Sequence, residues 1–311
     1  MVPKTTVGVL VKTAAVFLLF VCVGLRFVAP SVTVGDSGEF ATAASTLSIP
    51  HPPGFPLYAL AGKAVGTLLP LGGWAFRTNL FSLLCSAAAL ALFFDLAVVT
   101  GLGALPAAFA AALLAASPIL LYNSFVTEVF ALNLLAGVAA LRLLADPVLP
   151  PLRVAAAGGL LLGLAAGSHQ TIVLILPAAL LALWLRTASA PRLGRALAWA
   201  AGGFALGFTV YLFLPIRSAH QPPLDWGHPA DWTSAWHVIL RKDYGSLSLT
   251  VDSPLSRTPG NAALQAGRWL QALWAQWGPA AALSVLGAFV WPGTGLGLPV
   301  LLIFVFFTGP F

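Results

Sequence analysis

Long apolar segments alternate with polar stretches along the whole chain, which is the pattern of a protein that crosses a membrane several times. A full transmembrane helix needs roughly 20 apolar residues, and several segments reach that length. We predict an all-α, polytopic helical bundle that forms a single transmembrane domain over residues 1–311. The predicted spans are 8–29, 79–99, 102–121, 125–145, 154–167, 170–186, 195–215, 279–292 and 296–311, with outer loops at 30–78 and 216–278.

The composition excludes a soluble globular fold. Charged residues make up 8% of the chain, against roughly 25% in soluble domains, and hydrophobic residues make up 59%. The net charge of +6 does not indicate nucleic acid as a partner, because Lys and Arg are scattered at the ends of apolar runs, where they contact lipid headgroups. Cys22 and Cys85 lie inside apolar runs, which argues against a disulfide framework or a zinc site.

The basic residues predict the topology. If residues 56–70 form a helix that lies in the membrane interface and does not span, six basic residues share one side, which the positive-inside rule makes cytoplasmic. Those residues are Lys4, Arg142, Arg153, Arg186, Arg192 and Arg195. By the same rule, residues 154–186 should enter the membrane and return. We expect a protein of the bacterial inner membrane with a cytoplasmic N-terminus. Because the sequence stops inside an apolar run, we also expect a fragment that lacks further C-terminal spans.

This topology places most of the residues that are capable of chemistry on the extracytoplasmic face. The cytoplasmic side offers only Asp95 and Asp146 beside its arginines. A functional site is therefore expected on the outer face. Its candidate residues are Asp36, Glu39, His51, Glu128, His169, Arg217, Asp225 and His228.

The first motif, Gly35-Asp36-Ser37-Gly38-Glu39-Phe40, places two carboxylates three residues apart directly after a predicted span. A partly desolvated carboxylate at a membrane surface is a good general base for a hydroxyl group. The alternative is a helix cap without chemistry, because Asp-x-x-Glu resembles a capping box.

Three further sites each have a structural alternative. His51 lies in the stiff segment Pro50-His51-Pro52-Pro53, which favours a preorganised site but also fits a simple turn with a solvated histidine. Glu128 opens a predicted helix, where an acid is favourable for electrostatic reasons alone. His169 lies at a predicted helix break, where a histidine commonly bonds to the backbone.

The second outer loop is the richest in polar and aromatic residues. Arg217 leaves a helix end, where it would hold either a lipid headgroup or a phosphate ester. Trp226 and Trp232 would lie in the interfacial aromatic belt or stack on a sugar ring. The spacing of His228 and His237 matches no helical metal-ligand pair. The sequence contains no Walker A, GxSxG, HExxH or Rossmann motif, so nucleotide-driven chemistry is not indicated.

Taken in order, these motifs resemble one family. GDSGEF, HPPGFPLY and RTNLFS are followed by Tyr122–Glu128, Gly167-Ser168-His169, LPIRS, PPLDWGHP and RKDYG. The series is similar to multi-pass membrane proteins related to the eukaryotic transmembrane O-mannosyltransferase that modifies immunoglobulin-like domains of plexins. The resemblance implies a GT-C glycosyltransferase fold with interfacial helices in the first outer loop. It also implies a polyprenyl-phosphate sugar donor and an acidic catalytic residue in that loop, which corresponds here to Asp36, with Glu39 as the second acid.

The combined prediction is a glycosyltransferase that moves a sugar, possibly mannose, from a polyprenyl-phosphate donor to a protein or glycan acceptor. Membrane lipids are its other partners, and the sequence predicts neither a nucleic acid partner nor a metal site; a divalent metal requirement stays open. The alternatives are a transporter or flippase for a lipid-linked sugar, which needs ionisable groups near the bilayer midplane, and a non-enzymatic scaffold. The assigned roles are Asp36 and Glu39 in catalysis, Arg217, His169, His51 and Glu128 around the donor phosphate, and Tyr122, Asp225, Trp226 and His228 as acceptor or sugar contacts.

Overall fold

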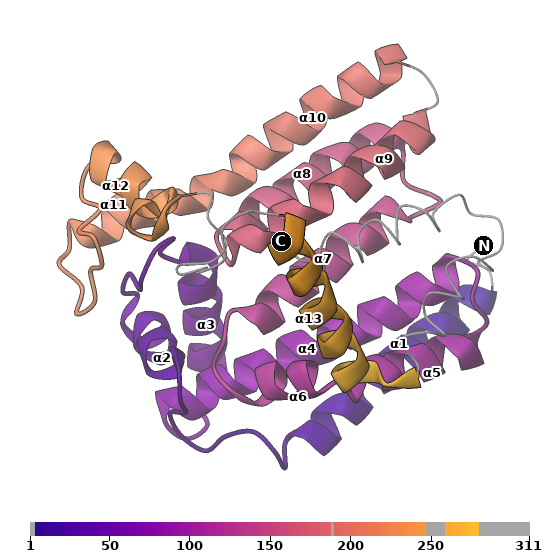
Figure 1. The fold of residues 1–311 in the computed structure, drawn as a ribbon, viewed down its shortest axis with the longest axis horizontal. Coiled ribbons are helices and arrows are strands. Elements are labelled where there is room, and N and C mark those ends of the chain that lie inside the picture. The colour runs from indigo at the N-terminus through magenta and orange to yellow at the C-terminus, as the bar shows by residue number, and fades with distance from the viewer. Residues whose placement is uncertain (1–3, 188–189, 247–258, 280–311) are drawn as a thin grey trace.

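The computed structural model describes residues 4–187, 190–246 and 259–279, and the regular secondary structure of this part is helical throughout (Figure 1). The α-helices are α1 Lys4–Gly24, α2 Ser37–Thr46, α3 Pro56–Leu68, α4 Trp74–Val99, α5 Ala104–Ala115, α6 Pro118–Phe125, α7 Phe130–Leu144, α8 Pro151–Ala166, α9 Leu176–Thr187, α10 Ala190–Phe208, α11 Phe213–Ser218, α12 Trp232–Ile239 and α13 Pro259–Trp277. Short 3-10 helices are η1 Gln170–Ile175, η2 Thr209–Leu212 and η3 Lys242–Tyr244.

Four helical segments of the described chain are long and apolar enough to cross a membrane: Val7–Gly24, Trp74–Val99, Gln170–Thr187 and Pro191–Ser218. The predicted all-α, polytopic membrane fold is confirmed. Helices α7 and α8 are apolar but shorter than a full span. The spans predicted at 279–292 and 296–311 lie outside the described residues, apart from residue 279. The described part of the predicted loop 216–278 contains α12, η3 and α13.

The segment predicted as one span over 102–121 is bent instead. Helices α5 and α6 meet at an angle of 69°. The bend falls at Ser117-Pro118, and Pro118 occupies the first turn of α6. Proline lacks the N–H that would continue the α5 ladder, but its fixed φ suits the start of a new helix, so the chain changes direction there.

Helices α8 and α10 approach so closely that their backbones are in contact. A Cβ atom added to Gly159 would lie 2.0 Å from the carbonyl oxygen of Ala200, and one on Gly163 would lie 2.2 Å from that of Phe204. Gly203 and Gly207 make the reciprocal approaches to α8. These two glycine pairs, each four residues apart, form the small-residue interface typical of helix pairs in membranes.

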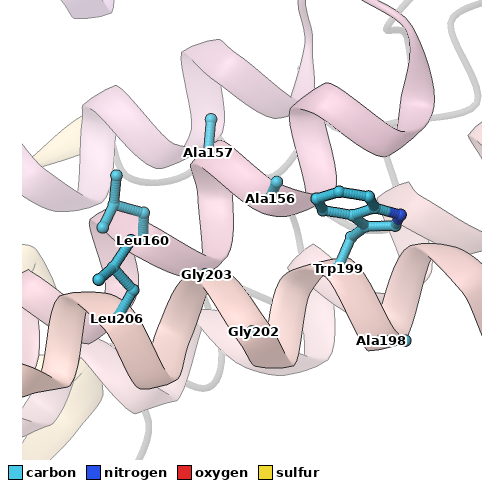
Figure 2. A pocket seen from close by; sticks show the side chains of 8 residues that line it. All are labelled: Ala156, Ala157, Leu160, Ala198, Trp199, Gly202, Gly203 and Leu206. Carbon is cyan, nitrogen blue, oxygen red and sulfur yellow. The ribbon is translucent and has the colours of Figure 1, made fainter.

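A shallow apolar groove follows the side of this helix pair. Figure 2 shows the residues that line it, with Leu160 and Leu206 at one end and Trp199 at the other. Its volume is about 540 Å³. Side chains of this kind on the outside of a bundle are suited to contact with lipid chains.

One end of the bundle carries α2 and α3, the helices of the predicted first outer loop, beside α11 and α12 (Figure 1). Helix α3 has 13 residues, so at ~1.5 Å per residue it extends about 20 Å, less than the ~30 Å of a hydrocarbon core. It packs against α2 and α4, and the fully buried Tyr58 belongs to that contact. We call this end of the bundle the site end.

The opposite end carries the turn between α7 and α8, together with the C-terminal end of α9 and the N-terminal end of α10. Arg142 pairs there with Asp95 and Asp146. Arg186 donates hydrogen bonds to the carbonyls of Leu144, Asp146 and Leu149. Arg142 and Arg186 therefore tie α4 and α9 to the α7–α8 turn.

Candidate active site

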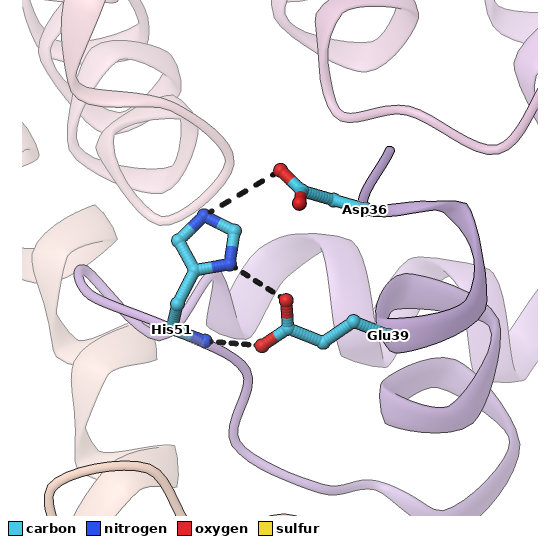
Figure 3. Close-up of side chains that lie close together, drawn as sticks. All are labelled: Asp36, Glu39 and His51. Carbon is cyan, nitrogen blue, oxygen red and sulfur yellow. Dashed lines mark hydrogen bonds and ion pairs between the residues drawn. The ribbon is translucent and has the colours of Figure 1, made fainter. Parts of the chain in front are cut away.

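Glu39 and His51 make a polar contact at two points at the site end (Figure 3). One Glu39 oxygen, Oε1, accepts a hydrogen bond of 2.7 Å from the backbone N–H of His51. The other, Oε2, lies 2.8 Å from the ring atom Nδ1. Glu39 lies in the first turn of α2, and His51 lies in the loop that connects α2 to α3. The same carboxylate therefore fixes both the loop and the ring.

Asp36 occupies the N-cap position of α2, but its side chain makes no capping hydrogen bond. Because Glu39 points to His51, the capping-box interpretation of this motif does not hold. The Asp36 side chain is 55% exposed, and its Oδ2 atom lies 3.9 Å from Nε2 of His51. Asp36 thus remains available for a ligand.

Aromatic rings hold the imidazole of His51 in place. Phe55 meets it edge-on at 5.0 Å between ring centroids, and Phe40 lies at 5.6 Å. Trp226, from the second outer loop, meets the ring edge-on at 6.4 Å. The ring has little freedom to rotate, and Nε2 faces Asp36 (Figure 3).

A pair of backbone hydrogen bonds brings the two outer loops together. Ile49 donates to the carbonyl of Leu224 at 2.8 Å, and Trp226 donates to the carbonyl of Ile49 at 3.2 Å. They form an isolated parallel bridge between Ile49 and Asp225. The bridge sets Trp226 beside His51 although the two residues are far apart in the sequence.

These elements enclose a cavity of about 460 Å³ at the site end. Its walls come from the first outer loop, the turn before η1 and the second outer loop. The lining residues are Asp36, Glu39, His51, Pro52, Pro53, Phe55, His169, Gln170, Trp226, Arg241 and Tyr244. Acidic, basic, amide and aromatic groups therefore converge on one space.

The Glu39–His51 contact changes the pKa of both groups. Burial by itself would raise the pKa of Glu39, but the hydrogen bonds from His51 and its positive charge hold it below its usual value. Burial would lower the pKa of His51, but the hydrogen bond to Glu39 and the charges of Glu39 and Asp36 raise it. Both shifts favour an ion pair, a carboxylate with an imidazolium.

Two other groups are shifted towards their neutral forms. Burial raises the pKa of Glu128 to about 7, and the nearby charge of Asp36 adds to the effect. Glu128 lies in the non-helical link between α6 and α7. Burial lowers the pKa of His169 to about 4, with smaller contributions from the positive charges of Arg241 and His51. His169 Nδ1 accepts a hydrogen bond from the backbone N–H of Thr171, so its neutral ring carries the proton on Nε2.

Arg217, predicted to hold a phosphate, lies elsewhere. Its guanidinium donates to the carbonyls of Leu47 at 2.8 Å and Thr46 at 3.2 Å, at the C-terminal end of α2. A cation there satisfies carbonyls that the helix leaves free and complements its dipole. Arg217 is not among the cavity-lining residues, so its contacts indicate a structural role.

The other predicted contacts divide between the cavity and its surroundings. Trp226 lines the cavity, whereas Asp225 accepts hydrogen bonds from Ser218 and His228. His228 is exposed, and Tyr122 is exposed on α6. Asp225 therefore stabilises the second outer loop around its bridge to Ile49.

Three polar residues that line the cavity, Gln170, Arg241 and Tyr244, were not among the predicted site residues. Arg241 makes no ion pair with a carboxylate among the described residues, and its guanidinium stacks on Tyr244 at 5.6 Å. Arg241 opens the RKDYG motif, which marks it as a candidate functional residue. No residue spacing in the sequence indicates that it shares a cavity with Asp36.

Asp36, Glu39 and His51 offer ligand atoms within 4.8 Å of one another. However, both Glu39 oxygens already accept hydrogen bonds from His51, and one donor is the ring nitrogen itself. This arrangement favours a shared proton between Glu39 and His51. The three residues form a hydrogen-bonded pair, Glu39 and His51, with the carboxylate of Asp36 beside it.

A buried asparagine ties the cavity to the bundle. Asn79 on α4 donates to the carbonyls of Ala29 at 2.7 Å and Ser31 at 3.0 Å, in the segment that leads to Asp36. Its side-chain oxygen accepts from Thr127 at 2.6 Å, beside Glu128. Asn79 thus anchors the segments before both acids.

Substitution of Asn79 by leucine should destabilise the protein by about 3 kcal/mol, because a hydroxyl and two carbonyls lose their partner in a buried site. The measurement is thermal unfolding in detergent. Asn123→Leu is the matched control, since its amide bonds only to the carbonyl of Ile119 within its own helix. Equal unfolding temperatures for the two variants would contradict this role.

Comparison with known proteins shows which family this chain belongs to. Residues 36–192 match the model of the protein O-mannosyl-transferase TMEM260 N-terminal domain. The chain belongs to the TMEM260 N-terminal domain family. The resemblance inferred from the motifs is therefore confirmed. The chain is 30% identical over 250 residues to mouse protein O-mannosyl-transferase TMEM260, and the match covers 78% of this chain and 35% of the mouse protein. The chain thus spans about a third of the length of that relative. No solved structure matches it.

The match to the TMEM260 N-terminal domain covers only part of the cavity. The match begins at Asp36 and ends at Arg192, near the start of α10. It includes Glu39, His51 and His169. Trp226, Arg241 and Tyr244 lie beyond it, so the cavity is built from the matched domain and the segment that follows it.

Proposed function

We propose that this chain carries the catalytic site of a GT-C-type glycosyltransferase that moves a sugar from a polyprenyl-phosphate donor to a hydroxyl group of a protein or glycan. The observation that supports it most directly is the cavity at the site end. There the carboxylate of Asp36, which caps no helix, faces the same space as Arg241 and His51. Membership of the TMEM260 family supports sugar transfer, with mannose as the first sugar to test.

In this proposal Asp36 is the general base. It removes the proton from the acceptor hydroxyl as the hydroxyl oxygen bonds to the anomeric carbon of the sugar. The bond from that carbon to the phosphate oxygen breaks, and its electron pair leaves with the lipid phosphate. One base is sufficient for such a displacement, so inversion at the anomeric carbon is the expected outcome.

Arg241 takes the role first predicted for Arg217. A guanidinium without a carboxylate partner is suited to a phosphate, because it offers paired N–H donors and keeps its charge. His169 and Gln170 line the same cavity from the wall at η1 and add N–H groups that can donate to phosphate oxygens. Such groups stabilise charge that develops on the leaving phosphate.

The proposed location is the extracytoplasmic face of the inner membrane. The helix bounds place Arg142, Arg153, Arg186 and Arg195 near the end of the bundle that is opposite to the cavity. An end rich in arginine is expected on the cytoplasmic side, so the cavity would open on the other side.

The two alternative functions predict different arrangements. A transporter needs ionisable groups along a path through the bilayer, whereas the cavity groups lie at helix ends and in connecting segments. A scaffold requires no convergence of polar groups, but seven residues with polar side chains line this one cavity: Asp36, Glu39, His51, His169, Gln170, Arg241 and Tyr244. The arrangement favours the transferase.

The function is tested by mass spectrometry of periplasmic proteins and lipids from cells with and without the gene. We expect a hexose on serine or threonine residues that disappears with the gene and returns with the full-length protein. Unchanged glycosylation together with an accumulated lipid-linked sugar on one leaflet would favour the flippase.

Replacing Arg241 by glutamine should lower kcat/KM for the lipid-phosphate donor by about 10²–10³-fold, the usual effect of losing one donor to a developing oxyanion. Lys242→Gln is the matched control, because Lys242 is an exposed cation that does not line the cavity. Arg217→Gln should instead lower the unfolding temperature. A selective loss of donor use in Arg217→Gln would restore Arg217 as the phosphate ligand.

A further inference from the structure

Glu39 directs both of its oxygens to a single residue. It accepts from the backbone N–H and the ring of His51, and it is half-buried, so little of its charge is left for a ligand. A carboxylate used in this way acts through the histidine. This contact is the same arrangement by which carboxylates orient histidines in many enzymes and fix which ring nitrogen carries the proton.

The contact determines what His51 presents to the cavity. Because Nδ1–H donates to Glu39, the other nitrogen, Nε2, is the group that faces Asp36 and the cavity. The Nε2 atom is 3.9 Å from Asp36 Oδ2, which is too far for a direct hydrogen bond. The two groups are therefore free to bind two different oxygen atoms of the substrates.

The charges around the ring favour its protonated form. Two carboxylates, Glu39 and Asp36, flank it. Arg241 and His169 face it from the other walls of the cavity, and only Arg241 carries a permanent positive charge. Glu128 acts on it from the α6–α7 link, while Phe40, Phe55 and Trp226 contribute no charge. The nearer carboxylate, Glu39, outweighs Arg241.

We propose that Glu39 is a positioning residue that holds His51 as an imidazolium whose Nε2–H donates to the leaving phosphate oxygen of the donor, while Asp36 binds the acceptor hydroxyl. The effect of this role on catalysis rests on the proposed sugar transfer. The geometry of the Glu39–His51 contact does not. The Nε2–H stabilises negative charge on the leaving phosphate oxygen, while Asp36 receives the proton of the acceptor hydroxyl. His51 returns unchanged at the end of the cycle.

The direction of the pH dependence follows from this role. The protonated ring is the active form, so transfer is present below the pKa of His51 and is lost as the pH rises through it. Removing the charge of Glu39 lowers that pKa, because the remaining partner is the more distant Asp36. In Glu39→Gln the alkaline loss of activity should therefore begin at a pH lower by about one pH unit.

The experiment combines two measurements on the full-length protein in nanodiscs. The first is the titration of histidine ring nitrogens by NMR, with the His51 signal assigned by its loss in His51→Gln. The second is the pH profile of kcat for sugar transfer. Both are recorded for the wild type, Glu39→Gln, Glu39→Asp and Asp243→Asn. The last variant is the matched control, because it removes the carboxylate near His237 instead.

We expect the His51 pKa and the alkaline limb of kcat to move together in Glu39→Gln, to return largely in Glu39→Asp, and to stay in place in Asp243→Asn. The proposal is overturned if Glu39→Gln lowers kcat without moving either quantity, or if transfer requires a divalent cation whose binding Glu39→Gln abolishes. If the wild type transfers no sugar but its His51 titrates as described, the positioning role stands and the proposed function fails.

Discussion

Asp36→Asn should reduce the kcat of sugar transfer by about 10²–10⁴-fold, which is the usual contribution of a general base. Asparagine has nearly the same shape but cannot accept the proton of the acceptor hydroxyl. The substitution should not disturb folding, because the Asp36 side chain caps no helix and is 55% exposed. The measurement is a single-turnover assay of the full-length protein with a polyprenyl-phosphate sugar, so that slow product release does not hide the chemical step.

Two controls define this result. The unfolding temperature of Asp36→Asn should equal that of the wild type, and Asp36→Glu should keep part of the activity because it retains a carboxylate. Transfer by Asp36→Asn at a rate close to that of the wild type would show that another group is the base. Glu128 would be the next candidate, since it lies close to Asp36 and its pKa is raised to about 7.

A large effect on folding is expected from a single methyl group added between α8 and α10. In Gly163→Ala the new Cβ would lie 2.2 Å from the carbonyl oxygen of Phe204 and 2.8 Å from the amide nitrogen of Phe208. These are backbone atoms, so no side-chain rotation relieves the contact, and the helices must separate. We expect a loss of about 3 kcal/mol, at the upper end of overpacking costs.

The matched control for this prediction is Gly202→Ala on the neighbouring face of α10. A Cβ at Gly202 meets nothing within 4 Å, and Figure 2 shows this glycine beside the open groove. Alanine there should leave the unfolding temperature unchanged or slightly raise it, because alanine is the better helix former. The measurements are unfolding temperature and the monodisperse fraction in detergent. If both variants behave alike, the close approach of the two helices is not required for folding.

Hydropathy predicted the helical membrane fold but placed several helix ends too late or too early. The span predicted at 79–99 begins at Trp74 in the structure. The added first turn contains Arg77 and Thr78, whose polarity assigned them to the loop. Arg77 donates to the carbonyl of Gly66, and Thr78 bonds to Thr127, contacts that a hydropathy scan does not register.

The part of the site that lies within one short segment of sequence was predictable. Asp36, Glu39 and His51 stood out because they are ionisable residues in one short apolar-flanked loop, and the structure places them together. The sequence offered no means of choosing between Arg217 and Arg241 in the second outer loop. That choice depends on the helix end at Leu47, which binds Arg217, and on the bridge at Ile49, which orients the loop that carries Arg241.

The bridge between Ile49 and Asp225 also has a consequence for biosynthesis. During translation His51 leaves the ribosome long before Trp226, Arg241 and Tyr244 exist, so the wall that they form is missing while α4 to α10 insert into the membrane. The nascent chain would therefore expose its charged pair without these cavity-lining side chains. If the proposed function holds, sugar transfer can begin only after the loop at 216–278 has docked on the loop at 30–78. A chain that stalls near residue 192 would hold the whole matched domain and still lack this wall of the cavity.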